Sequence, residues 1–163
     1  MARRRHGAGT PATVALDAAG VTYTLRAYEH DPGAASFGLE AAESLGVDPA
    51  RVLKTLLAET DRGLVVGIVP VDGMLDLKAL AAAVGVKRAV MAEPAVAERV
   101  TGYVVGGISP IGQRRRLVTV LDSSADQFAT VLVSGGRRGL DLELSPADLV
   151  TVTGASSAPI ARS

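Results

Sequence analysis

Lys54 is the side chain whose surroundings in this sequence most favour a chemical role. The chain contains fourteen arginines but three lysines, and Lys54 stands in the apolar run of residues 52–57. On an alternating strand it shares one face with Val52 and Leu56, so we expect its cation to point inward or into a cleft. An ammonium partly shielded from water there would hold an anionic or carbonyl oxygen strongly, because the local dielectric is low. A lysine that snorkels from a strand edge is the alternative.

Two glycine-rich segments could place backbone amides against a ligand. They are Gly106-Gly107, at the start of residues 106–112, and Ser134-Gly135-Gly136, which adds a hydroxyl. Without side chains, the backbone can approach a ligand oxygen closely. Tight turns with no ligand are the alternative. Between residues 102 and 139 five arginines stand against two aspartates, and this local positive excess suits a few phosphates, such as an RNA end, better than a long duplex.

Several common catalytic sets are missing from the chain. There is no cysteine, which excludes a disulfide framework, a cysteine nucleophile and thiolate zinc sites. Imidazole is available only from His6 and His30. His30 could act as a base, but a surface histidine bonded to Asp31 or to the backbone is the alternative. No pattern typical of a metal site, a P-loop or a nucleophile elbow occurs, so we expect neither a metal nor a cofactor.

The overall charge and hydropathy narrow the class of protein. Seventeen basic residues balance seventeen acidic ones, so the chain lacks the global cationic field of a protein that coats duplex nucleic acid. The hydrophobic content is 48%, but aromatic residues make up only 3%, which predicts an aliphatic core. Apolar stretches such as residues 64–71 are far shorter than the roughly 20 residues of a membrane helix. Residues 1–9 contain no apolar signal core, and we expect a cytoplasmic protein.

Short helices and short strands alternate around these residues. Capping residues and glycine stops predict helices at residues 11–19, 39–45, 76–84 and 94–100, and from residue 146 onward. Alternating apolar residues predict strands at residues 21–27, 52–58, 64–69, 86–91, 103–105, 117–121, 128–133 and 140–144. A hairpin turn is predicted at residues 61–63, and the two glycine-rich segments are predicted as turns.

This pattern predicts a single α+β domain. Many short strands, joined partly by hairpins and interspersed with short helices, favour a mixed, strongly curved, barrel-like sheet flanked by the helices. The domain is expected at residues 10–155, which is long enough for a sizeable core. Residues 1–9, with Arg3, Arg4 and Arg5, are expected to form a flexible arm, for which an RNA-gripping role is the alternative. Residues 156–163 are expected to form a C-terminal tail.

Five segments occur in an order that resembles a known family. The segments are Tyr28-Glu29-His30-Asp31-Pro32, residues 52–57 with Lys54-Thr55, Pro70-Val71 ahead of residues 75–78, Thr101-Gly102-Tyr103 with residues 106–110, and residues 134–136 leading to Gly139-Leu140-Asp141. Together they resemble the YbaK/EbsC family of freestanding editing deacylases, which is similar to the editing domain of prolyl-tRNA synthetase. The likeness runs from about residue 10 to residue 149, and it is greatest to the branch that hydrolyses cysteinyl-tRNA(Pro).

The resemblance implies a trans-acting deacylase with Lys54 as its most characteristic functional residue. The matching pocket positions, expected to bind the substrate, are Tyr28, Thr55, Gly106, Ser134 and Asp141, with Gly135 beside Ser134. The amides of Gly106 and Gly107 would stabilise an oxyanion, while Lys54 would anchor the terminal adenosine phosphate or the carbonyl. In this branch the substrate's own thiol attacks the ester carbonyl, which gives a cyclic thioester and free tRNA. Such an intramolecular reaction benefits greatly from orientation.

The resemblance also indicates the partners. The aminoacyl-adenosine end of a mischarged tRNA is the expected substrate, and a complex with prolyl-tRNA synthetase is expected. A relative that removes alanine from Ala-tRNA(Pro), by attack of water or a ribose hydroxyl, is one alternative. The other is a non-catalytic module that binds aminoacyl-tRNA or a synthetase and borrows RNA affinity from a partner.

Overall fold

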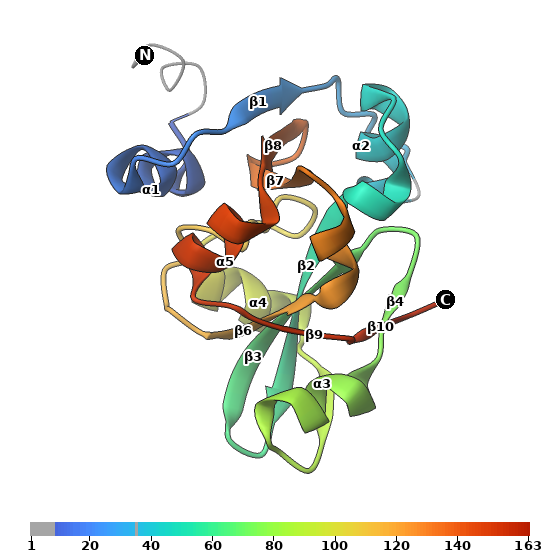
Figure 1. The fold of residues 1–163 in the computed structure, drawn as a ribbon, viewed down its shortest axis with the longest axis vertical. Helices are drawn as coiled ribbons and strands as arrows, with labels where there is room; N and C mark the ends of the chain where they lie inside the picture. Colours follow the sequence, from blue (N-terminus) through green and yellow to red (C-terminus); the bar gives the residue numbers. More distant parts are fainter. Residues whose placement is uncertain (1–8, 35) are drawn as a thin grey trace.

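The computed structural model describes residues 9–34 and 36–163 (Figure 1). The predicted N-terminal arm, with Arg3, Arg4 and Arg5, lies outside the described residues except for Gly9. Within the described ranges, no helix is both long and apolar enough to cross a membrane.

Each α-helix in the described residues ends at a glycine in the left-handed conformation. The helices are α1 (Pro11–Ala19), α2 (Phe37–Leu45), α3 (Leu77–Val84), α4 (Pro94–Thr101) and α5 (Pro146–Thr153), and two short 3-10 helices are η2 (Pro49–Arg51) and η3 (Ser123–Gln127). The start predicted at Thr10 is confirmed, because its hydroxyl accepts a hydrogen bond from the Thr13 amide. Helix α2 begins earlier than predicted, since the Ser36 hydroxyl accepts a bond from the Leu39 amide.

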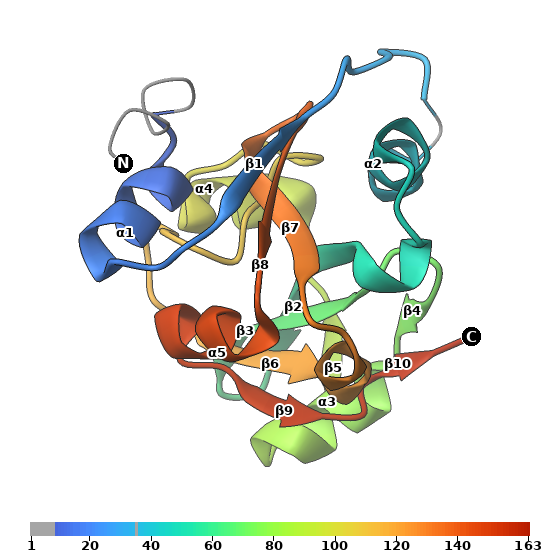
Figure 2. The ribbon, with the colours of Figure 1, turned by 45° about the horizontal axis from the view of Figure 1, so that its top comes forward.

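The strands form three separate sheets (Figure 2). The five-stranded sheet has the order β5 (Ala89–Met91), β2 (Leu53–Thr60), β3 (Gly63–Pro70), β6 (Val118–Asp122) and β9 (Ser156–Ala158). The three-stranded sheet has the order β1 (Thr24–Ala27), β8 (Leu140–Leu144) and β7 (Val131–Arg137), and a small sheet pairs β10 (Ala161–Arg162) with β4 (Met74–Leu75). Strands β3, β6 and β9 are parallel neighbours, while the other pairs are antiparallel.

The predicted α+β class is confirmed, but the barrel-like sheet is wrong. The five-stranded and three-stranded sheets meet through the isolated parallel bridge between Val52 and Leu132. Beyond this bridge β2 and β7 form no ladder, so no sheet closes on itself, and closure needs continuous pairing around the ring.

Two local predictions are also wrong. Residues 103–105 form no strand, because Tyr103 is buried and donates its hydroxyl proton to the Ile111 carbonyl, which organises a loop. Ser134-Gly135-Gly136 is not a turn but part of β7, with an irregular register between Ser134 and Arg137. A Cβ on Gly135 would lie 2.8 Å from the Leu140 side chain, so glycine here permits close packing of β7 against its partner.

The expected C-terminal tail is part of the fold. Ser156–Ala158 pairs with β6, and the side chain of Ile160 is fully buried. One carboxylate oxygen of Asp122 accepts hydrogen bonds from the amides of Ile160 and Ala161, at 2.8 and 2.9 Å. These long-range contacts could not be inferred from the short polar sequence of residues 156–163.

The core is aliphatic, as predicted, and it has separate parts. A large cluster fills the space between the two main sheets and includes Leu16, Ile68, Leu121 and Leu142. A second cluster lies under α3, which covers the five-stranded sheet (Figures 1 and 2). A third cluster packs α2 against Val52, just before β2, and against Leu132 near the start of β7. This third cluster holds α2 beside the space between the two main sheets.

Candidate active site

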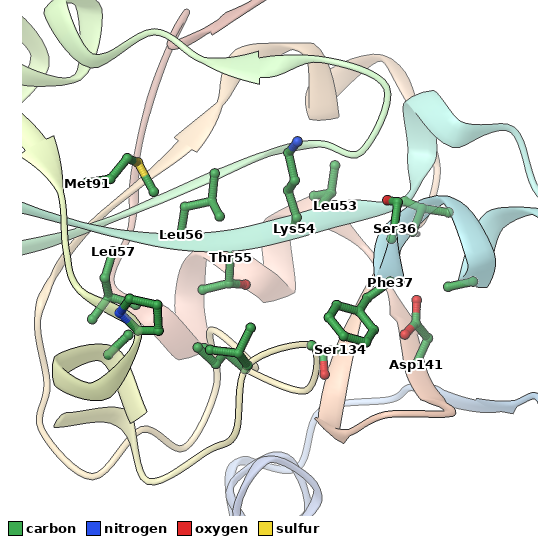
Figure 3. Close-up of a pocket in the computed structure, with 18 of the residues that line it drawn as sticks. Ser36, Phe37, Leu53, Lys54, Thr55, Leu56, Leu57, Met91, Ser134 and Asp141 are labelled. Carbon is green, nitrogen blue, oxygen red and sulfur yellow. The ribbon is translucent and has the colours of Figure 1, made fainter. Parts of the chain in front are cut away.

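A cavity of about 410 Å³ opens between the two main sheets (Figure 3). Its wall is formed by β2, the start of α2, the start of α4, the loop near Gly106, and the facing residues of β7 and β8. The apolar part of the lining includes Leu53, Leu56, Leu57, Ala92, Ala97 and Ile108. This size and mixture of apolar walls with a few polar groups are typical of small-molecule sites.

Six of the eight residues selected from the sequence line this cavity. They are Tyr28, Lys54, Thr55, Gly106, Ser134 and Asp141. The other two, Gly107 and Gly135, are not part of the lining. Segments far apart in the chain therefore converge here.

Thr55 contributes an unpaired hydroxyl to the cavity. The residue is 9% exposed, and its Oγ1 is buried without a hydrogen-bond partner among the described residues. Figure 3 shows its side chain on the same side of β2 as Ser134 and Asp141. An unsatisfied buried hydroxyl costs about 1–3 kcal/mol, so its presence here is typical of a group kept for a ligand.

Lys54 lines the cavity from the opposite face of the strand. It is half-buried, and Figure 3 shows its ammonium together with Leu56 on the side of β2 away from Thr55, Ser134 and Asp141. No ion pair to Lys54 is formed within the described part of the chain. The alternation predicted for β2 is thus observed, and the Lys54 cation lies near the rim, separated from the other polar groups by the strand.

Ser134 and Asp141 are directly opposite each other on β7 and β8. The Asp141 carboxyl is 5% exposed, and this burial raises its pKa to about 7, although the charge of Arg26 acts in the opposite direction. Burial, and next the Asp141 charge, also raise the pKa of Tyr28, whose amide donates to the Gly139 carbonyl at 2.9 Å. The cavity therefore holds a carboxyl whose pKa is raised into the neutral range.

Gly106 and Gly107 have different surroundings. Gly106 has a φ of +91°, and a Cβ there would lie 2.9 Å from the Phe37 ring. The amide of Gly107 donates to the Val104 carbonyl at 2.8 Å, and its Cα packs against the backbone of Arg137. The expected oxyanion contact from Gly107 is therefore not available in this structure, because its donor is already used within the loop.

Gly135 also has a packing role. Its carbonyl accepts a hydrogen bond from the Thr10 hydroxyl at 2.5 Å, which ties the start of α1 to β7. Because Gly135 is surrounded by Thr10 and Leu140, it supports Ser134 rather than contacting the cavity.

Phe37 is a lining residue that the sequence patterns did not single out. The Arg138 guanidinium lies 4.7 Å from the centre of the Phe37 ring, and it donates to the Val105 carbonyl from Nε at 2.9 Å and Nη2 at 2.6 Å. These contacts join α2, the Gly106 loop and the β7–β8 turn above the cavity. The available signal was that Phe37 is one of two phenylalanines and follows the Ser36 cap.

His30 does not reach the cavity lining. Its Nδ1 lies 2.9 Å from a carboxylate oxygen of Glu40, and its ring centre is 5.8 Å from that of Phe37. The pKa of Glu40 is lowered, first by the hydrogen bond from the Asp31 amide and then by His30. The structure therefore favours a supporting role for His30, although its partner is Glu40 rather than Asp31 or the backbone. In the described ranges, no three or more potential metal-binding side chains are grouped together.

Fold and cavity together define a small α+β domain with a binding cavity between its two main sheets, and the comparison with protein families identifies its class. Residues 31–152 match the family model of the aminoacyl-tRNA editing domain, and the chain belongs to this family. Over 120 residues, 73% of each protein, it is 40% identical to EbsC of Enterococcus faecalis (strain ATCC 700802 / V583), named as a candidate Cys-tRNA(Pro)/Cys-tRNA(Cys) deacylase. The family resemblance inferred from the five segments is confirmed.

Solved structures show the same fold. A candidate trans-editing enzyme for prolyl-tRNA synthetase is 22% identical, with a TM-score of 0.83 and coverage of 100% of this chain and 99% of the other. The hypothetical protein APE2540 is 30% identical, with a TM-score of 0.81 and coverage of 90% of this chain and 96% of the other. The first of these matches spans the whole chain, including the C-terminal strands.

Proposed function

We propose that this protein is a trans-acting deacylase that removes cysteine from mischarged Cys-tRNA(Pro). The observation that carries the proposal is a cavity of about 410 Å³ in an editing domain whose lining serine and threonine hydroxyls form no hydrogen bond to a basic side chain among the described residues. Ser134 accepts a bond from the Gly136 amide, and His30 is paired with Glu40 outside the lining. A hydroxyl needs an adjacent base to become a good nucleophile, so a substrate that supplies its own nucleophile suits this site. The name of EbsC supports cysteine as the amino acid.

The cysteine thiol then acts as the nucleophile. Its sulfur attacks the ester carbonyl carbon, a carbon–sulfur bond forms, and the bond from that carbon to the ribose oxygen breaks. The thiol proton passes to the ribose oxygen, which leaves tRNA with a free hydroxyl and cysteine as a cyclic thioester that water opens. The cavity need only fold the aminoacyl group so that sulfur faces the carbonyl.

The polar groups of the cavity have distinct proposed roles. The amide of Gly106, a residue of the loop that lines the cavity, stabilises the developing oxyanion, and Tyr28, Ser134 and Asp141 surround the aminoacyl group. Lys54 lies on the other face of β2, so it binds a phosphate of the tRNA end where the strand enters the cavity, rather than the ester carbonyl.

A panel of Cys-, Ala-, Ser- and Pro-tRNA(Pro), incubated with the protein and no synthetase, tests this function. We expect rapid loss of cysteine and slow loss of serine, because a hydroxyl is the weaker nucleophile. Comparable rates for Cys- and Ser-tRNA(Pro) would indicate attack by water. Selective loss of alanine would reassign the enzyme to Ala-tRNA(Pro), and binding without any deacylation would make it a non-catalytic module.

We further propose that prolyl-tRNA synthetase assists the reaction in the cytoplasm, where mischarged tRNA is produced. The chain has no net charge, so its own affinity for the tRNA phosphates is expected to be low. A partner that already holds the tRNA raises its effective concentration at the site. The deacylation rate at nanomolar protein should therefore rise when the synthetase is added, and an unchanged rate would argue against this partner.

A further inference from the structure

Glu143 on β8 binds groups from three other segments of the chain. Its carboxylate accepts hydrogen bonds from the Arg26 guanidinium of β1, from Arg51 Nη2 of η2 at 2.9 Å, and from the hydroxyl of Thr130, just before β7, at 2.6 Å. The Thr130 hydroxyl first, and then the two arginines, lower the pKa of Glu143, so the carboxylate is ionised at neutral pH. None of these four residues lines the cavity, and the proposed reaction does not use them.

Arg26 reaches Glu143 by extending past its own register partner. In the β1–β8 ladder, Arg26 pairs with Asp141, whereas Glu143 is two residues further along and pairs with Thr24. The Cβ atoms of directly opposite residues are about 4.5–5.5 Å apart, and diagonal neighbours are about 7–8 Å apart. Asp141 is therefore the nearer carboxyl on this face of the sheet. No ion pair to it is formed within the described part of the chain.

Other polar side chains around Asp141 come from β1, β7, β2 and α2. They are Tyr28, Ser134, Lys54 and Glu40. The pKa of Tyr28 is raised, so its phenol is neutral, and Glu40 is paired with His30. The Lys54 ammonium is on the opposite face of β2 (Figure 3). The cation that acts on the pKa of Asp141 is accordingly its register partner on β1.

The two arginines depend on Glu143 to different degrees. Arg51 also donates to the Thr130 carbonyl from Nε at 3.0 Å and to the Thr130 hydroxyl from Nη2 at 2.7 Å, so it keeps two bonds without Glu143. Among the described residues, the Arg26 guanidinium is bonded to Glu143 alone. If this carboxylate were absent, Arg26 would lose its partner while a nearer carboxyl remained. A guanidinium and a carboxylate form a strong, charge-assisted pair, so Arg26 would turn to Asp141.

We propose that Glu143 is a positioning residue that holds Arg26 away from Asp141 and so leaves the Asp141 carboxyl free for the substrate. The cation of a cysteinyl ester is its α-ammonium, and a carboxyl already paired with a guanidinium would bind it weakly. Glu143 itself touches no reacting atom and acts through Arg26. The benefit to the substrate rests on the proposed function, whereas the competition of two carboxyls for one guanidinium does not.

Carbon-13 NMR titration of the Asp141 carboxyl tests this competition without any activity. The proteins compared are the wild type, Glu143→Gln, Arg26→Met and the double variant. With Arg26 present, Glu143→Gln should lower the pKa of Asp141, with a fall in proton affinity of about tenfold or more, because the freed cation turns to it. In the Arg26→Met background the same change should be less than about twofold, because only repulsion by a partly exposed carboxylate is removed. Equal changes in both backgrounds, or no change in either, would overturn the proposal.

The variant Arg26→Met keeps the titration decisive if Glu143→Gln does not fold, because the Arg26 side chain is partly exposed and tolerates replacement. It should raise the pKa of Asp141, since the Arg26 charge lowers it. An unchanged pKa would separate Arg26 from Asp141 and overturn the proposal. Glu59→Gln, at an exposed position of β2, removes one negative charge elsewhere and is the matched control. A change as large as that in Glu143→Gln would show a general effect of charge and would also overturn it.

Steady-state deacylation of Cys-tRNA(Pro) by the same four proteins tests the positioning role. Glu143→Gln should raise KM about tenfold with kcat changed less than about twofold, the loss expected for one charge-assisted contact. Adding Arg26→Met should return KM to within about threefold of the wild type, and a KM that stays high would indicate a structural role instead. If the wild type does not deacylate this substrate, the proposed function fails while the NMR titration still decides the competition. If the wild type is active and Glu143→Gln has the same KM, the function stands and the positioning role is wrong.

Discussion

Asp141 lies directly opposite Arg26 in the β8–β1 ladder, yet the Arg26 guanidinium pairs with Glu143, further along β8. Glu143 also accepts hydrogen bonds from Arg51, at 2.9 Å, and from the Thr130 hydroxyl, at 2.6 Å. Asp141 is thus buried beside a cation that is engaged elsewhere, and burial dominates its pKa. Two carboxyls on one strand therefore have opposite pKa shifts, with opposite effects on stability.

The variant Asp141→Asn should change the pH dependence of stability. Burial raises the pKa of Asp141 to about 7, so its contribution to stability is complete at low pH and is lost as pH rises through 7. Asparagine does not ionise and so removes this loss. Relative to the wild type, the unfolding free energy of the variant should therefore rise between pH 4 and pH 7, by about 4 kcal/mol at most. Urea unfolding at several pH values measures the difference. A difference that does not vary with pH would contradict the assigned pKa.

The variant Glu143→Gln should show the opposite sign. The Thr130 hydroxyl, and then Arg26 and Arg51, lower the pKa of Glu143, so its stabilisation is present above the ordinary pKa and is lost in acid. We expect the unfolding free energy of the variant to be about 1–3 kcal/mol lower than that of the wild type at pH 7, and this difference to shrink toward pH 3. The same unfolding series provides the measurement, and an undiminished loss at pH 3 would show that the carboxylate charge is unimportant.

The variant Thr55→Val should stabilise the protein and weaken substrate binding. Valine keeps the shape of threonine and removes a buried hydroxyl that has no protein partner, so unfolding free energy should rise by about 1 kcal/mol. In contrast, KM for Cys-tRNA(Pro) should increase. Thr55→Ser, which keeps the hydroxyl, is the matched control for binding. Reduced stability in the valine variant would mean that the hydroxyl has a structural partner.

The variant Lys54→Ala should abolish most deacylation while the fold survives. A lost phosphate contact is expected to lower kcat/KM by roughly 10- to 100-fold, mainly through KM, and Lys54→Arg should retain part of the activity. Lys87, which is exposed at the far end of the five-stranded sheet, offers the control Lys87→Ala. Steady-state kinetics at two salt concentrations checks the electrostatic origin. An unchanged kcat/KM in Lys54→Ala would refute the role.

The variant Gly106→Ala should close part of the cavity. Its Cβ would lie within 3.0 Å of the Phe37 ring and of Arg138, in addition to the strain of a φ of +91°. Gly63 has a φ of +108° but open space around the Cβ position, so Gly63→Ala isolates the strain, which is about 1–2 kcal/mol. We expect a larger thermal destabilisation in Gly106→Ala than in Gly63→Ala, because the clash adds to the strain, and lost deacylation only in Gly106→Ala. Full activity of Gly106→Ala would show that Phe37 can move aside.

Local signals explain why the helix ends could be predicted. The caps Thr10 and Ser145 bond to amides three residues away, and glycines such as Gly20 and Gly85 adopt the left-handed conformation at the helix ends. These interactions lie within one helical turn, so neighbouring residues are sufficient to specify them. Glycines in β7 have no such local signature. Gly135 must lack a side chain because Leu140 packs closely against it, and its carbonyl accepts a hydrogen bond from Thr10. Its role therefore depends on which segments pack against it.

The family, the α+β class, most helix boundaries and six residues that line one cavity could be inferred from the sequence alone, because these depend on residue types and short spacings. Only the tertiary structure decided how those residues face one another. It placed the Lys54 ammonium across β2 from Asp141, engaged the Gly107 amide with Val104, and left the Thr55 hydroxyl without a partner among the described residues. Each of these outcomes depends on where a distant strand ends or a loop packs, and residue spacing contains no information about that.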